Sequence, residues 1–419
     1  MRNRMSYKEA KEIYKSYGVD TEEAIRKLSQ KAISIHCWQG DDVTGFDSPT
    51  GGAGNGIAVT GNYPGKARSF EELKADFLKA ASLIPGKKRI NLHACYAIFT
   101  EENPWVDRDQ MEYKHFIPWV EFAKEHGFGI DFNGTFFSHN KVKNGLTLSS
   151  PDPEIRNFWI RHAIQCRRIS EKIGEALGDN VECDIWIPDG YKDTPADRLG
   201  PRLRLKDALD EILKEECPHV IDCVESKFFA LGVESYTVGS NEFYLGYAAT
   251  HKNIYNLLDA GHFHPEESIA DKIPALLPYF RYVPLHVTRG VHWDSDHVVS
   301  FDDDTREICR EIVRNDALER VLIGLDFFDG SINRIAAWVI GSRNIEKCLL
   351  SALLEPNQEL KEAEDDADFT KRLMLQEEMK TLPFGDVWAE YCRRQGVPTD
   401  RIWYDEVKKY EAQVTSKRI

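Results

Sequence analysis

The strongest constraint on the fold is a regular alternation of strand-like and helix-like segments along the chain. Short apolar runs are followed by longer segments in which apolar residues have helical spacing, and this pair recurs about eight times at intervals of roughly 40 residues. The strand-like runs lie at residues 32–38, 89–95, 129–134, 184–188, 220–227, 255–261, 282–289 and 320–330. The helix-like segments that follow them lie at 70–84, 114–127, 154–177, 202–216, 240–253, 266–280, 304–319 and 332–355.

This alternation predicts an α/β protein with a closed (β/α)8 TIM barrel. An open, doubly wound sheet is the alternative fold. It is disfavoured because the first strand is not followed by a GxGxxG pattern. In addition, the strands carry polar residues at their C-terminal ends, and in a barrel those ends all face one shared pocket.

The length of the chain indicates one large domain with additions. A chain of 419 residues with 42% hydrophobic residues can fill a single large core. We expect residues 1–355 to form the barrel, preceded by an N-terminal helical segment with two short helices within 6–30. Residues 356–419 are charged and mostly helical in period, which predicts a C-terminal helical extension that packs on the barrel or on a neighbouring subunit. Its candidate apolar anchors are Trp388, Tyr391, Trp403 and Tyr404.

Charge and cysteine content limit the partners and the compartment. The balance of 54 Lys and Arg against 69 Asp and Glu gives a net charge of −15, which disfavours binding to nucleic acid. The nine cysteines form no CxxC pair, and several lie within apolar strand-like runs, which is typical of a reducing compartment. No signal-peptide core and no apolar run of about 18 residues is present. We therefore expect a soluble cytoplasmic protein with no membrane or nucleic-acid partner.

Acidic and histidine side chains concentrate at the ends of the last four predicted strands. Carboxylates and imidazoles are the ligands of Mn²⁺, Mg²⁺, Co²⁺ or Zn²⁺. One candidate ion site comprises Glu225, Asp259, His286 and Asp326. A second comprises His262, Asp294 and Asp296, the last two in a D-x-D pattern in the loop after the seventh strand. The alternative interpretation is structural, with Lys227 neutralising a buried carboxylate such as Glu225.

Other strand ends carry candidate substrate contacts. Trp38, Phe132, Trp186 and Phe328 could offer apolar faces to a ligand, although each could equally belong to the core. His36 and His93 could act as a base or as a partner for a hydroxyl group. The Gly-rich segment 39–65 is too long for a simple connection, and such loops are usually functional or mobile.

Eight segments carry a resemblance to a known family. They are SIHCWQGDDVTGF, TGNYPGKARS, NLHACY, IWIPDGYKD, VESKFFALGVESYTVGSNEFYLGYA, LDAGHFHP, LHVTRGVHWDSDHVV and IGLDFFDGSINRIAAWVIGSRN. Over essentially the whole chain, they resemble the bacterial L-rhamnose isomerases, within the wider group of xylose-isomerase-like barrels. Several of these segments are long and rich in Trp, His and Asp, so the resemblance is specific to this family.

The resemblance implies a homotetrameric cytoplasmic enzyme that interconverts L-rhamnose and L-rhamnulose with two divalent ions, typically Mn²⁺, with Co²⁺, Zn²⁺ or Mg²⁺ as alternatives. The structural ion of the family would be held by Glu225, Asp259, His286 and Asp326. The catalytic ion would be held by His262, Asp294 and Asp296, with Lys227 beside it.

The mechanism expected for such an enzyme is a metal-assisted 1,2-hydride shift on the opened sugar. Lys227 would stabilise negative charge on O1, and Asp294 would act through the catalytic ion. An enediol route is the alternative, with His93 as the candidate base. Two other functions remain open. A metal-dependent hydrolase on the same barrel is disfavoured by the net charge if its substrate is a nucleic acid, and a non-catalytic sugar-binding protein is disfavoured by the complete ligand set.

Overall fold

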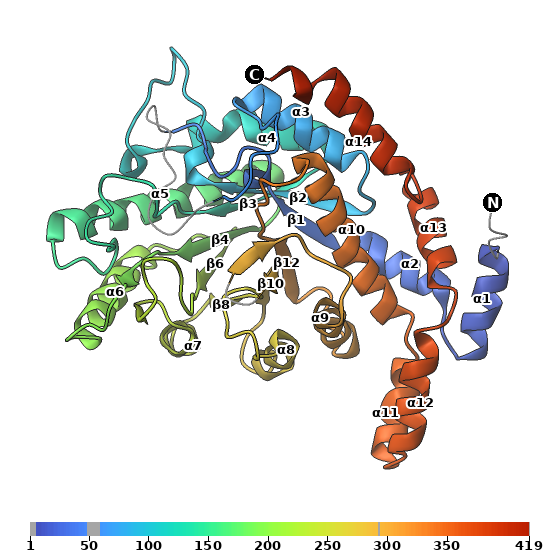
Figure 1. Ribbon diagram of the computed structural model, residues 1–419. Coiled ribbons are helices and arrows are strands. Elements are labelled where there is room, and N and C mark those ends of the chain that lie inside the picture. Colours follow the sequence, from blue (N-terminus) through green and yellow to red (C-terminus); the bar gives the residue numbers. More distant parts are fainter. Residues whose placement is uncertain (1–5, 48–58, 292–293, 419) are drawn as a thin grey trace.

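The computed structural model describes residues 6–47, 59–291 and 294–418, and the central part of segment 39–65 lies outside these ranges. Eight parallel strands close into a barrel (Figure 1), in the order β1-β12-β9-β8-β6-β4-β3-β2. The prediction of a (β/α)8 barrel is confirmed, and the open sheet is excluded because β1 pairs with both β2 and β12. The strands are β1 (Ala32–His36), β2 (Lys87–His93), β3 (Gly129–Asn133), β4 (Val181–Trp186), β6 (Val220–Glu225), β8 (Ile254–Asp259), β9 (Val283–Val287) and β12 (Val321–Leu325).

Each barrel strand is followed by a helix of the surrounding layer. The longest, α5, shows why the chain forms these helices where it does. Its N-cap Asp152 accepts a hydrogen bond from the backbone N–H of Glu154, and the helix ends at Gly178 in the left-handed conformation. The layer comprises α3 (Phe70–Ala81), α4 (Ile117–His126), α5 (Pro153–Leu177), α6 (Leu199–Ile212), α7 (Asn241–Thr250), α8 (Ile269–Leu276), α9 (Asp303–Arg314) and α10 (Arg334–Leu353).

The barrel strands are covered on both faces, which determines where polar side chains can lie. Every residue of β6, β8 and β9 is buried. Polar residues at the C-terminal ends of these strands therefore lie inside the protein, where each needs a partner. The helix layer seals the outside, as in the hydrogen bond from the indole of Trp338 on α10 to the carbonyl of His36, at 2.8 Å.

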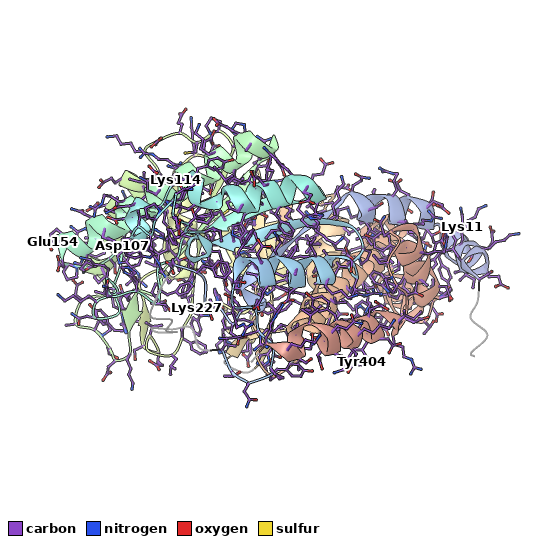
Figure 2. The ribbon with its side chains drawn as sticks, turned by 90° about the horizontal axis from the view of Figure 1, so that it is seen from above. Lys11, Asp107, Lys114, Glu154, Lys227 and Tyr404 are labelled. Carbon is purple, nitrogen blue, oxygen red and sulfur yellow. The ribbon has the colours of Figure 1, made fainter. Side chains whose placement is uncertain are left out.

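Most of the helices at the two ends of the chain pack on the outside of the barrel, whereas α11 and α12 pack mainly on each other and project from it (Figure 1). Trp388 and Tyr391 on α13 are buried, as the anchor prediction requires, but Tyr404 on α14 is 48% exposed and is not an anchor. Figure 2 shows Tyr404 on the side of the molecule formed by the terminal helices. These helices are α1 (Tyr7–Ser16), α2 (Thr21–Gln30), α11 (Asn357–Asp365), α12 (Phe369–Met379), α13 (Phe384–Arg394) and α14 (Ile402–Gln413).

Two small antiparallel sheets of two strands each lie outside the barrel sheet, and the second of them is a hairpin. One pairs β5 (Gly190–Tyr191) with β7 (Tyr236–Thr237), and the other pairs β10 (Arg289–Val291) with β11 (Asp294–His297). Each arises from segments that follow barrel strands at their C-terminal ends. Short 3-10 turns complete the described elements, namely η1 (Cys37–Gln39), η2 (Ala94–Tyr96), η3 (Arg108–Gln110), η4 (Tyr113–Phe116) and η5 (Thr415–Lys417).

All nine cysteines are free thiols, and all but Cys217 are buried. Within the three described ranges, no helix combines the length and apolarity needed to cross a membrane.

Candidate metal centre

Four side chains from neighbouring strands converge at the C-terminal mouth of the barrel. Glu225 ends β6, Asp259 ends β8, His286 lies near the end of β9, and Asp326 directly follows β12. One ligand atom from each lies within 4.8 Å of the corresponding atoms of the others. The structure thus brings together the four residues that the order of the strands predicts to meet.

Two imidazoles contact the carboxylate of Glu225. His286 Nδ1 lies 3.0 Å from Glu225 Oε2, and His262 Nδ1 lies 2.7 Å from Glu225 Oε1. Both oxygens of the Glu225 carboxylate thus lie beside a histidine. Gly324 leaves the space that His286 occupies, because a Cβ at that position would lie 2.8 Å from His286 Cδ2.

Burial and neighbouring charges shift the acid–base equilibria of these groups. Burial disfavours the charged form of Glu225, but His262 and His286 outweigh it and hold the pKa of Glu225 well below its usual range. Burial likewise opposes charge on His286, yet its contact with Glu225 raises the pKa of His286. For Asp259, burial is the largest effect and raises the pKa. The directions of these shifts follow from the close approach of acids and imidazoles within one buried cluster.

The donor set fits a divalent cation. Three carboxylates and one imidazole lie close together, and such a set suits Mn²⁺, Co²⁺, Zn²⁺ or Mg²⁺. Asp259 Oδ2 is buried and has no hydrogen-bond partner among the described residues. A buried carboxylate oxygen without a partner is costly, and coordination to a cation would remove that cost. This cluster could therefore hold a metal ion.

The second predicted ion site is described only in part. His262 is 7% exposed and lies beside Glu225, with its Nε2 4.0 Å from Asp259 Oδ1. The backbone of Asp294 and Asp296 forms β11 of the β10–β11 hairpin, so the prediction that both lie in a loop is wrong. The side chains of Asp294 and Asp296 lie outside the described part of the structure.

A cavity adjoins the cluster and contains most of the predicted substrate contacts. Its wall includes Trp38, His93, Trp186, Lys227 and Phe328 beside the candidate ligands. The indole Nε1 of Trp38 donates a hydrogen bond to Asp326 Oδ1 at 2.9 Å, so Trp38 also fixes one of those ligands. Figure 2 shows Lys227 away from the ends of the molecule, which are occupied in that view by Glu154 and Lys11.

Phe132 is not part of this cavity, so its prediction as a substrate contact is corrected. Its ring packs edge-on against Phe116 of the helix layer, with centroids 5.0 Å apart. Side chains alternate along a strand, so Phe132 points outward and its neighbour Asn133 points into the cavity. The aromatic wall on this side comes instead from Phe137.

His93 is a neutral imidazole in the cavity wall. Its ring packs against Trp38 and Phe137, with centroid distances of 4.6 Å and 5.3 Å. Burial lowers the pKa of His93 to about 3. A group with that pKa is a weak base, so the environment of His93 suits hydrogen bonding to a hydroxyl better than removal of a carbon-bound proton.

Sequence reasoning missed four residues that line the cavity: Val43, Asn133, Phe137 and Asp184. Two of them carried a usable signal. Asp184 is an acid in an apolar strand, two residues before Trp186 and so on the same face, and Asn133 ends β3. Val43 and Phe137 lie in connections whose path the strand pattern does not fix.

The fold and site define a (β/α)8-barrel protein with a candidate divalent-metal centre at the C-terminal ends of its strands. Residues 1–418 match the model of the L-rhamnose isomerase family. The chain belongs to that family, whose members are aldose–ketose isomerases. This membership displaces the hydrolase and non-catalytic alternatives.

The curated relatives cover nearly the entire chain. It is 54% identical over 411 residues to the L-rhamnose isomerase of Cronobacter sakazakii, covering 98% of this chain and 97% of the relative. It is 54% identical over 416 residues to that of Mannheimia succiniciproducens, covering 99% of each. A solved L-ribulose 3-epimerase is 13% identical, with a TM-score of 0.48, covering 77% of this chain and 95% of the epimerase.

Proposed function

We propose that this protein interconverts L-rhamnose and L-rhamnulose by a 1,2-hydride shift on the opened sugar. The observation that carries the proposal is the cluster of Glu225, Asp259, His286 and Asp326 beside a cavity that Lys227 lines. Moving a hydrogen between C1 and C2 requires the two oxygens of the substrate to be held and polarised together. A cluster of ligands beside a cationic side chain meets that requirement.

The proposed cofactors are two divalent ions per chain, with Mn²⁺ as the first expectation and Co²⁺, Zn²⁺ or Mg²⁺ as alternatives. Glu225, Asp259, His286 and Asp326 would hold the first, and His262, Asp294 and Asp296 the second. When bound, such ions polarise the sugar oxygens and lower the pKa of bound water.

The residues of the cavity wall act on the substrate directly. Lys227 donates a hydrogen bond to O1 and stabilises the charge that develops there. Its backbone is fixed, since its N–H donates to the Gly239 carbonyl and its carbonyl accepts from Thr237 Oγ1. Trp186 and Phe328 offer apolar faces to the carbon chain of the sugar, and His93 pairs with a hydroxyl group. Together these side chains bind the sugar and limit access of water.

The direct test is metal removal followed by re-addition of single metals. Prolonged chelation is expected to abolish formation of ketose from L-rhamnose, and Mn²⁺ or Co²⁺ is expected to restore it. Initial rates across aldohexoses and 6-deoxy sugars identify the preferred substrate. Full turnover by protein shown to be free of metal contradicts the proposal.

We further propose that the protein is a cytoplasmic homotetramer. Large apolar side chains that its own barrel leaves uncovered support an assembly, including Leu199 on α6 and Leu373 on α12, which are 65% and 58% exposed. The free thiols suit a reducing compartment. Light scattering of the purified protein measures the number of subunits.

A further inference from the structure

A large cavity lies at the opposite mouth of the barrel from the candidate metal centre. It has a volume of about 690 Å³ and shares no lining residue with the cavity beside the metal centre. Its walls come from the N-terminal parts of the barrel strands, including Ser34 on β1, Asp131 on β3 and Glu182 on β4. We refer to it as the basal cavity. Its volume falls in the range of ordinary small-molecule sites.

The charges that line the basal cavity are balanced. Five cationic and five acidic side chains contribute to its wall, which favours neither an anion nor a cation as a ligand. These side chains are Arg26, Lys27, Lys31, Arg89 and Arg320, and Asp131, Asp179, Glu182, Asp316 and Glu319.

The arginines in the wall already have partners within the protein. Arg89 donates to Asp131 and Asp179, and Arg320 donates to the carbonyls of Leu277 and Phe280 at 2.6 and 2.7 Å. They therefore offer little to an anionic ligand. The only cluster of potential metal ligands in the described part of the chain is the one at the other mouth, which argues against a metal ion here.

Glu182 differs from the other groups in the wall. It is only 8% exposed, and its carboxylate makes no hydrogen bond or ion pair with any described residue. Lys31 Nζ donates to the carbonyls of Leu318, at 2.8 Å, and Val321, at 2.5 Å, which leaves one of its three N–H groups for another acceptor. Glu182 and Lys31 interact electrostatically, but the Lys31 nitrogen and the Glu182 oxygens lie farther apart than the 4.0 Å limit for an ion pair.

The electrostatics of this pair agree with the missing contact. Burial raises the pKa of Glu182 to about 8 and lowers the pKa of Lys31 to about 8. With a pKa of about 8, Glu182 keeps its proton at neutral pH, whereas Lys31 is charged. Two buried polar groups that face one cavity without touching require polar atoms between them. A hydroxyl group both donates and accepts, so it can pair with the carboxyl group and with the ammonium at once.

We propose that the basal cavity is a second binding site, for a small neutral polyol whose hydroxyl groups bridge Glu182 and Lys31. Ile221, Tyr282 and Leu322 supply an apolar wall for the carbon-bound hydrogens of such a ligand. Glycerol and a monosaccharide share this chemistry, and the experiment below distinguishes them. The proposal does not depend on the isomerase activity, because the two cavities have no residue in common.

Equilibrium dialysis of the metal-loaded full-length protein tests the site, with labelled glycerol and labelled L-rhamnose as separate probes. For the wild type we expect one more bound molecule of at least one probe per chain than for Glu182→Leu. In Glu182→Gln, which keeps the volume of the side chain, the dissociation constant at this site should rise by about twofold to tenfold, as for loss of one hydrogen bond between uncharged groups. The exposed rim variant Glu319→Gln is the matched control and should bind like the wild type.

The other measurements separate binding from folding. Glu182→Leu should keep kcat and KM for isomerisation and should melt no lower than the wild type, because it removes a buried carboxyl group that lacks a partner within the protein. If Glu182→Leu fails to fold, Glu182→Gln carries the comparison alone. If the wild type binds more glycerol than the Glu182 variants but no more L-rhamnose, the site exists and takes the smaller polyol. If it binds more L-rhamnose but no more glycerol, the site takes the sugar. Equal numbers of both probes in the wild type and in both Glu182 variants overturn the proposal and leave water as the occupant.

Discussion

At the scale of single residues, Lys227 is the side chain whose role separates a catalytic from a structural interpretation of the site. If it stabilises charge on O1, Lys227→Met should lower kcat by roughly a hundredfold or more, with a modest change in KM. Steady-state kinetics with saturating metal measure this split. Lys192→Met is the control, since Lys192 is an exposed lysine after β5.

A purely structural role for Lys227 predicts a different pattern. In that case Lys227→Met should lower the melting temperature and the metal content, while the folded fraction keeps its turnover number.

Glu346 on α10 provides a second test at this scale, outside the active site. It is 1% exposed, and burial raises its pKa to about 8 although the nearby Lys88 acts in the opposite direction. In the unfolded chain the same group has a pKa near 4.5. Between these two values the unfolded state releases a proton that the folded state retains, so the wild type loses stability as pH rises through this window.

Glu346→Gln cannot ionise, so it should escape that loss. The melting temperature of the variant minus that of the wild type should increase steadily from about pH 5 to about pH 8. The control is Glu378→Gln, at an exposed position of α12. Parallel curves for Glu346→Gln and wild type would show that Glu346 is ionised in the folded protein.

At the scale of secondary-structure elements, the two proposed ion sites rest on different supports. Glu225, Asp259 and His286 are fixed in barrel strands, whereas Asp294 and Asp296 belong to the β10–β11 hairpin outside the barrel sheet. Ligands in the barrel should hold their ion more tightly. The double variant Asp294→Asn, Asp296→Asn should therefore remain folded, with about one metal ion per chain and essentially no isomerase activity.

Asp326→Asn is the matched comparison. This change should lower both the metal content and the melting temperature, because it leaves Glu225 and Asp259 poorly compensated within the barrel. Metal analysis and melting curves of both variants decide the assignment. Two ions retained in the hairpin variant, or wild-type stability in Asp326→Asn, would show that the sites are exchanged.

The same distinction explains what the sequence could predict about the site. Glu225, Asp259, His286 and Asp326 were predictable because neighbouring parallel strands end at the same mouth of a barrel. The β10–β11 hairpin was not, because its two strands are only three and four residues long and carry no apolar alternation.

Within a strand, the sequence does not state which face is inward. Phe132 and Asn133 are adjacent, and an aromatic residue suits either a pocket or the helix layer. The order of the elements thus followed from periodicity, whereas the direction of individual side chains depended on the closure of the barrel.

At the scale of the whole molecule, the last part of the C-terminal segment, α13 and α14, contacts α10 of the helix layer around the barrel. Tyr391 on α13 is fully buried, and Arg343 on α10 donates to the Pro398 carbonyl at 3.0 Å. Near the C-terminus, Arg418 pairs with Asp76 of α3 at 2.5 Å. We therefore propose that residues 356–419 are an integral part of the folded domain. A chain that ends at residue 355 should show a much lower melting temperature than the full chain, or should aggregate, because the faces of α3 and α10 become exposed.

Two tyrosines in the same segment sharpen this test. Tyr391→Ala removes a fully buried ring between α13 and the barrel, and should cost about 3 to 5 kcal/mol of unfolding free energy, as for other large aromatic residues truncated in a core. Tyr404→Ala removes a ring that is 48% exposed and should cost much less. Denaturant unfolding of both variants measures the difference. If the two changes cost the same, the terminal helices are held to the barrel more weakly than the buried contacts of α13 indicate, and residues 1–355 are then the stable unit.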